Sequence, residues 1–215
     1  MQSTSTKQLG QWQGDLGRQY TDRNTMTPEQ LDALWMKNYG ISRSAVNRDF
    51  LGALPKDIHI LEVGCNIGNQ LLLLQELGFS NLQGLEIQDY ALELARRQGR
   101  GIQFSQGSAF NLPFADDSFD LVFTSGVLIH IAPQDLPTAL SQIHRCAKRY
   151  IFGSEYYATA VTRVRWREQD EVMWKMDYAK EYLAHFEDLS LVVERRLPYL
   201  ESDNVDSVFL LQKLV

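Results

Sequence analysis

Apolar and polar positions alternate along this chain in two rhythms, which predict alternating strands and helices. Short apolar runs are typical of strands buried on both faces, and the stretches between them repeat apolar residues at helical spacing. The expected strands are residues 58–63, 82–87, 102–105, 119–124 and 150–153, and the expected helices are residues 69–77, 90–98 and 133–148. This alternation predicts a mostly parallel sheet covered by helices.

The region before the first expected strand has a different pattern. Residues 1–26 are polar with scattered aromatic side chains, and we interpret them as an arm or lid. Thr27 can cap a helix, Pro28 suits its first position, and Gln30 completes a capping box. A second helix is expected over residues 44–54.

The end of the chain predicts antiparallel pairing. A helix over residues 177–186 is followed by expected strands over 189–197 and 205–214, and strands joined by a short turn must be antiparallel. We therefore expect one α/β domain over residues 55–215, with a three-layer, Rossmann-like, mostly parallel sheet that ends in an antiparallel hairpin. Residues 1–54 would form its lid or cap.

Composition and charge narrow the classes of function. The chain has 215 residues, enough for one well-buried core, and a net charge of -6, which argues against broad binding to nucleic acid or anionic membranes. Cys65 and Cys146 lack the spacing of a zinc site or a disulfide framework, so we expect no metal. No apolar run reaches transmembrane length and the N-terminus lacks a signal-peptide core, so we expect a cytoplasmic protein.

The turn after the first expected strand carries the candidate chemistry. It reads EVGCNIG over residues 62–68. Ligands of open α/β sheets bind beyond the carboxyl ends of the strands. Gly64 lets the chain turn with no side chain in the ligand's way, and Gly68 lets the next helix approach closely. The second expected strand ends in Glu86, where an acid can accept hydrogen bonds from both ribose hydroxyls.

The middle of this turn distinguishes two classes of ligand. Dinucleotide sites use GxGxxG, whose second glycine admits the pyrophosphate. Here that position is Asn66, whose side chain would crowd a diphosphate, and Glu62 would be an odd neighbour for phosphates. A ligand that has a cationic amino group and no phosphate fits better, and S-adenosylmethionine is such a ligand.

The chain resembles the class I S-adenosylmethionine-dependent methyltransferases from about residue 54 to residue 215. Residues 62–68 match the family's E/D-x-G-x-G-x-G motif except at the middle glycine, and Leu85-Glu86 matches its acidic motif. Residues 119–123 with 127–130 match its fourth-strand motif. The resemblance implies the sheet order 3-2-1-4-5-7-6.

A narrower resemblance is to the methylases associated with pseudaminic acid biosynthesis. It is carried by Trp12-Gln13-Gly14-Asp15, residues 20–24, the G-C-N-I-G turn, residues 126–131 and Ser154-Glu155-Tyr156-Tyr157. Residues 166–177 depart from that group in detail.

The resemblance implies a set of cofactor contacts. The turn at Glu62 would face the methionine part, Glu86 the ribose, and Ile87 and Ala109 the adenine, with Ser108 at its edge. Residues of the N-terminal arm would close over the cofactor. The full expected set is Tyr20, Arg23, Glu62, Gly64, Cys65, Asn66, Gly68, Asn69, Glu86, Ile87, Ser108, Ala109, Thr124 and Ser125.

Methyl transfer to a hydroxyl or amine can also need a base, and the acceptor must be held in line with the methyl group. His130 and Glu155 follow strand ends near the expected pocket and are the candidate bases, while Glu155 and Tyr156 could instead orient a hydroxyl-rich acceptor. Three arginines within residues 163–167 would suit an anionic acceptor such as a carboxylated sugar, or they form a solvated helix or loop face.

Two functions of different class therefore remain. The first is an enzyme that methylates oxygen or nitrogen of a small polar acceptor. The second is a sensor or scaffold that keeps the fold and binds S-adenosylmethionine without turnover.

Overall fold

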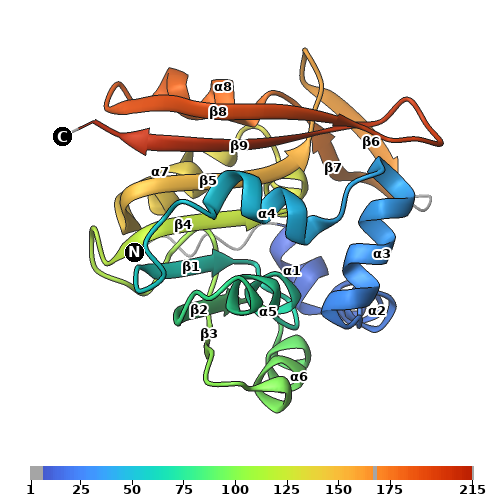
Figure 1. Cartoon of the computed structure of the whole chain (residues 1–215). Helices are drawn as coiled ribbons and strands as arrows, with labels where there is room; N and C mark the ends of the chain where they lie inside the picture. Colours follow the sequence, from blue (N-terminus) through green and yellow to red (C-terminus); the bar gives the residue numbers. More distant parts are fainter. Residues whose placement is uncertain (1–6, 167–168, 215) are drawn as a thin grey trace.

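A seven-stranded sheet in the order β3-β2-β1-β4-β5-β9-β8 organises the protein, whose computed structural model describes residues 7–166 and 169–214 (Figure 1). The strands are β1 (His59–Val63), β2 (Asn81–Glu86), β3 (Gln103–Gln106), β4 (Phe119–Ser125), β5 (Ala147–Tyr156), β6 (Thr162–Trp166), β7 (Gln169–Lys175), β8 (Leu189–Pro198) and β9 (Val205–Lys213). The strands β1 to β5 pair in parallel, and β9 runs antiparallel to both β5 and β8. The expected fold and strand order are confirmed.

Helices cover both faces of the sheet, as the apolar strands require. They are α1 (Lys7–Gln13), α2 (Asp15–Arg23), α3 (Pro28–Tyr39), α4 (Arg43–Leu51), α5 (Asn69–Glu76), α6 (Asp89–Gln98), the short 3-10 helix η1 (Leu128–His130), α7 (Leu136–Cys146) and α8 (Tyr178–His185). Ile60 of β1 packs in the cluster that contains α3, α4 and α5, while Leu61 and Val63 pack in the cluster that contains α7 and α8. No described helix is long and apolar enough to span a membrane.

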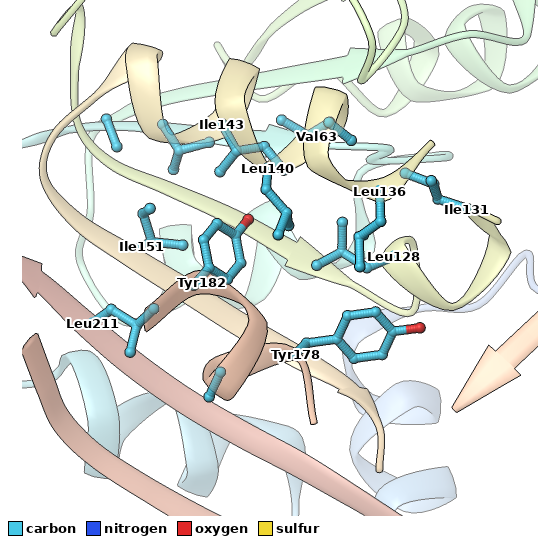
Figure 2. Packing of buried hydrophobic residues seen from close by; sticks show 14 of the residues in the cluster. Val63, Leu128, Ile131, Leu136, Leu140, Ile143, Ile151, Tyr178, Tyr182 and Leu211 are labelled. Atoms are coloured by element: carbon cyan, nitrogen blue, oxygen red, sulfur yellow. The ribbon is translucent and has the colours of Figure 1, made fainter. Parts of the chain in front are cut away.

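The α7 and α8 face shows how the apolar spacing becomes packing. Leu136, Leu140 and Ile143 recur on one side of α7, and Figure 2 shows them beside the rings of Tyr178 and Tyr182 from α8. All of these side chains are buried. This layer packs against β4 and β5.

The start of α3 confirms the expected capping box. Thr27 Oγ1 accepts the backbone N–H of Gln30 at 3.3 Å, and Gln30 Oε1 accepts the backbone N–H of Thr27 at 2.9 Å. Pro28 occupies the first turn, where its missing N–H costs nothing.

Several boundaries differ from the expected ones. The described part of the N-terminal arm forms α1 and α2, whose glycines and polar residues had hidden the helical pattern. The second expected helix begins at Arg43 and stops at Leu51, because Leu54 turns back to donate its N–H to the Leu51 carbonyl. The fifth strand runs on to Tyr156, because antiparallel pairing with β9 continues past Gly153.

The hairpin of β6 and β7 is the other unexpected feature. These antiparallel strands form a separate two-stranded sheet, and β7 lies against η1. The arginine-rich stretch therefore lies mainly on a strand and not on a helix or loop. Arg163 is exposed on β6, and Arg167 lies outside the described residues.

Candidate functional site

A cavity of about 240 Å³ opens at the carboxyl ends of β1, β2 and β4. Residues of α1 and α2 form part of its wall, and in Figure 1 the arrow of β1 points towards α1. The expected site residues that line it are Tyr20, Glu62, Gly64, Cys65, Asn66, Asn69, Glu86, Ile87, Ser108, Ala109, Ser125 and His130. The expected site residues outside its lining are Arg23, Gly68, Thr124, Glu155 and Tyr156.

The turn after β1 has a backbone that restricts which residues fit. Gly64 has φ 74°, and a Cβ there would lie 2.6 Å from Val127 Cγ2. Gly68 has φ 85°, and a Cβ there would lie 2.9 Å from the Phe104 ring. Asn66, in the place of the middle glycine, has φ 48°. Asparagine is among the few residues other than glycine that visit this left-handed region readily. The missing glycine therefore leaves the turn geometry intact.

Substitutions of Asn66 should separate the role of its backbone from that of its amide. We expect Asn66→Gly to keep the thermal stability, whereas Asn66→Ala should lose about 1 kcal/mol because alanine resists positive φ. Melting temperatures measure this difference. Equal melting temperatures for the two variants would show that the turn relaxes out of the left-handed region.

Glu86, at the end of β2, ties two loops of the cavity together. Its Oε2 accepts the N–H of Asn66 at 2.8 Å, and its Oε1 accepts those of Ile87 at 2.8 Å and Gln88 at 3.0 Å. Burial raises the pKa of Glu86, while these N–H groups lower it. A carboxylate has about four acceptor sites, so one remains for a ligand hydroxyl.

Four buried oxygen atoms of the cavity wall have no hydrogen-bond partner among the described residues. They are Glu62 Oε2, Asn66 Oδ1, Asn69 Oδ1 and Gln70 Oε1. Buried acceptors without donors are costly, so this wall fits a ligand rich in N–H and O–H groups. Within the described lining, Glu62 and Glu86 are the acidic residues, and neither lysine nor arginine is present. The wall therefore also fits a cationic group and disfavours phosphates.

The residues expected around an adenine lie on one side of the cavity. Ile87 and Ala109 both line it, from the ends of β2 and β3. Ser108 Oγ accepts the N–H of Phe110 at 3.2 Å, which fixes the turn after β3. Their contacts with an adenine stay a prediction.

Aromatic rings from the N-terminal helices close the cavity over η1. The Trp12 ring centroid lies 4.3 Å from that of His130 and 5.4 Å from that of Tyr20. Burial, followed by the nearby Tyr156 and the acids Glu86 and Glu155, raises the pKa of Tyr20 to about 12. Tyr20 is therefore a neutral hydroxyl in the cavity wall at physiological pH.

Gln88 anchors these helices, and the sequence did not reveal it. Its Nε2 donates to the carbonyls of Trp12 and Gly14 at 3.2 Å each, and its Oε1 accepts from Thr21 Oγ1 at 3.1 Å. A Cβ on Gly17 would lie 2.5 Å from Gln88 Nε2, so the helices approach closely here. The signal that the sequence offered is the amide side chain of Gln88, two residues after Glu86 at the end of β2.

We expect Gln88→Leu to loosen α1 and α2. The change removes the hydrogen bonds of a buried amide to the Trp12 and Gly14 carbonyls and to the Thr21 hydroxyl, which costs about 1–3 kcal/mol. Limited proteolysis should then cut the N-terminal helices faster, and any ligand held under them should bind on the order of tenfold more weakly. Tyr90→Phe, which removes only the exposed bond to Asp22, is the control. Equal protease sensitivity of Gln88→Leu and wild type would contradict the anchor.

Glu155 lies behind the cavity wall. Its Oε1 and Oε2 accept the N–H groups of Val127 at 3.2 Å and Ile129 at 3.4 Å, and the Thr124 side chain also hydrogen-bonds to it. Glu155 is buried, and its expected contact with an acceptor stays a prediction. Its carboxylate holds η1, which carries His130.

Tyr156 and Arg23, expected at the acceptor and over the cofactor, both lie outside the cavity lining. Tyr156 packs its ring 6.1 Å from that of Tyr199, with Lys175 Nζ 5.3 Å from its ring centroid. Arg23 is exposed in the last turn of α2. Of the three expected catalytic residues, only His130 lines the cavity.

Comparison with known proteins points to one family. Residues 61–150 match the family described as "Methyltransferase domain". The chain is 36% identical over 91 residues to the O-methyltransferase cnsE of Penicillium expansum, a match that covers 40% of this chain and 32% of that protein. Likewise, 30% identity over 82 residues relates it to the methyltransferase GfsG of Streptomyces halstedii, covering 35% of this chain and 30% of that protein. The matches thus span well under two thirds of these relatives.

Solved structures share the fold. The 1,6-didemethyltoxoflavin-N1-methyltransferase of Burkholderia thailandensis, crystallised with S-adenosylhomocysteine, superposes with TM-score 0.64 at 19% identity, covering 80% of this chain and 76% of that chain. The [4+2]-cyclase SpnF superposes with TM-score 0.65 at 14% identity, covering 80% of both chains. Since a cyclase shares it, the fold alone does not specify the reaction.

Proposed function

We propose that this chain, which carries a class I S-adenosylmethionine-dependent methyltransferase domain, methylates an oxygen or nitrogen atom of a small polar acceptor. The observation that carries the proposal is the cavity wall, where four buried acceptor oxygens and two acids meet without a lysine or arginine among the described lining residues. S-adenosylmethionine carries an ammonium group, two ribose hydroxyls and an adenine amine, which are the donors that this wall needs.

The residues present fit this cofactor. Glu62 and Asn66 would hold its amino-acid end, and Glu86 would accept a hydrogen bond from a ribose hydroxyl. Ile87 and Ala109 would enclose the adenine. When bound, S-adenosylmethionine supplies a methyl group on a positively charged sulfur.

The chain's own contribution to methyl transfer would be alignment, exclusion of water and removal of a proton. Trp12 and Tyr20 close the cavity above η1, which would keep water from the reacting atoms. His130 is the candidate base, because it is the only imidazole among the described lining residues. Its ring packs against that of Trp12 with an angle of 56° between the ring planes, which would orient it towards an acceptor.

For the acceptor, we propose a carboxylated, sugar-like molecule. The β6–β7 hairpin lies against η1, so an acceptor that reaches His130 would pass beside it. Arg163 on β6 can pair with a carboxylate. The likeness of the G-C-N-I-G turn to that of the pseudaminic acid-associated methylases supports the same acceptor class.

Two measurements test the proposal. Titration calorimetry with S-adenosylmethionine should give saturable binding, and release of S-adenosylhomocysteine should depend on an acceptor. The panel should contain carboxylated sugars and their neutral counterparts at equal concentration. Turnover on neutral sugars alone would overturn the anionic acceptor, binding without any turnover would favour a sensor or scaffold, and absence of binding would overturn the proposed function.

A further inference from the structure

Arg43 is a fully buried cation over Phe152, which is joined to Glu62 through Phe123 in the register of the sheet. It begins α4, its exposed fraction is 0%, and it does not line the cavity. Its guanidinium carbon lies 4.6 Å from the Trp35 ring centroid and 5.7 Å from that of Phe152. Its Nη1 donates to Ser154 Oγ at 2.8 Å. Packing and one neutral hydrogen bond thus hold a charge in the core.

The remaining donors of Arg43 lack local partners. Its Nε and Nη2 have no hydrogen-bond partner within the described residues. Burial lowers the pKa of Arg43 to about 10, which still leaves it charged at physiological pH. Its favourable electrostatic interactions are with Glu62 first, then with Tyr39, Asp206 and Glu155. A buried cation of this kind strongly favours an ionised neighbour.

Glu62 joins this buried cation to the cavity. Its exposed fraction is 2%, its Oε2 has no partner among the described residues, and it lines the cavity. Burial raises the pKa of Glu62 well above its usual range, Arg43 lowers it, and the neighbouring Glu86 raises it. The Cys65 thiol is the further titratable group that faces Glu62. Arg43 is therefore the group that opposes neutralisation of Glu62.

We propose that Arg43 is a positioning residue, which acts from behind the cavity wall to favour the ionised form of Glu62, the form that binds the ammonium group of the cofactor. The inference rests on the proposed function, since it presumes that S-adenosylmethionine occupies the cavity. The arrangement places the ligand cation on one side of Glu62 and a permanent protein cation on the other. It also makes an N-terminal helix part of cofactor recognition without direct contact.

Proton release during binding tests this role. Arg43→Met keeps an unbranched side chain of similar length and removes the charge, so a larger fraction of Glu62 should be protonated in the free variant than in wild type. Titration with S-adenosylmethionine at pH 7, in buffers of different ionisation enthalpy, should then show up to one more proton released per ligand than in wild type. Affinity should fall about tenfold for each unit by which the pKa of Glu62 rises above 7.

Matched variants separate this effect from general damage. Glu62→Gln should weaken binding without extra proton release, and Arg43→Met combined with Glu62→Gln should resemble Glu62→Gln alone. Arg43→Lys should restore wild-type proton release. If Arg43→Met does not fold, Arg43→Gln, which can still donate to Ser154, takes its place.

Two outcomes are contrary and distinguishable. In the first, wild type binds S-adenosylmethionine, and the Arg43→Met or Arg43→Gln variant binds it equally well and releases no extra proton. This result overturns only the role of Arg43. Wild type that does not bind S-adenosylmethionine overturns the proposed function, and the role of Arg43 with it.

Discussion

Alanine in place of Glu86 is expected to reduce S-adenosylmethionine binding by on the order of 100-fold or more. The ligand would lose the charge-assisted hydrogen bond from a ribose hydroxyl to this carboxylate, which is worth about 1.5–3 kcal/mol. The substitution would also leave the N–H groups of Asn66, Ile87 and Gln88 without their acceptor, and these groups shape the cavity between β1 and α6. Titration calorimetry measures the loss directly.

Two variants make this result specific. Glu86→Gln keeps the volume and one acceptor oxygen but points an amide N–H₂ at backbone donors, so its affinity should lie between wild type and Glu86→Ala. Glu93→Ala removes an exposed acid on α6 outside the cavity and should bind as wild type does. If Glu86→Ala bound S-adenosylmethionine with wild-type affinity, the assignment of Glu86 to the ribose would be wrong.

The parts of the fold that the sequence predicted are those set by neighbouring residues. The capping box of Thr27 and Gln30 spans four residues and forms as expected. The apolar run in β1 leads to burial on both faces, because Ile60 and Leu61 point to opposite helical layers. The turn that follows brings Glu62, Asn66 and the other expected lining residues together, since parallel strands share one carboxyl edge.

The parts that the sequence did not predict depend on distant contacts. Arg43 precedes the helix expected over residues 44–54, and its burial arises only when Trp35, Phe152 and Ser154 surround it. Gln88 becomes an anchor only because α1 and α2 fold back beside the start of α6. In the β6–β7 hairpin, β7 lacks an alternating apolar pattern, and the hairpin is held by pairing within itself and by contact with η1.

Glu155 illustrates the same limit at the site. Its position after the fifth strand was readable, but the direction of its side chain was not. The carboxylate points at the backbone of the turn between β4 and η1, where N–H groups of Val127 and Ile129 meet it. This arrangement assigns Glu155 an effect on stability that depends on pH.

Wild-type stability is expected to fall between about pH 5 and pH 8, and Glu155→Gln should remove much of that fall. Burial raises the pKa of Glu155 from 4.5 to about 7, although hydrogen bonds from Thr124 and backbone N–H groups oppose the rise. Since the folded state binds the proton more tightly than the unfolded chain, ionisation costs stability as pH rises through this window. The cost reaches about 3 kcal/mol once the folded carboxyl is ionised.

Differential scanning calorimetry of wild type and Glu155→Gln across this pH range measures the effect of Glu155 on stability. Asp206, whose pKa burial raises to about 6, contributes a fall of the same sign to both proteins, so the difference between the two curves isolates Glu155. If stability fell in parallel with pH in wild type and Glu155→Gln, the raised pKa of Glu155 would be contradicted. Because Glu155→Gln keeps an acceptor for the N–H groups that hold η1, a loss of turnover far larger than its change in stability would instead indicate that Glu155 acts on the acceptor directly. Retained turnover would leave proton removal to His130, which η1 carries into the cavity.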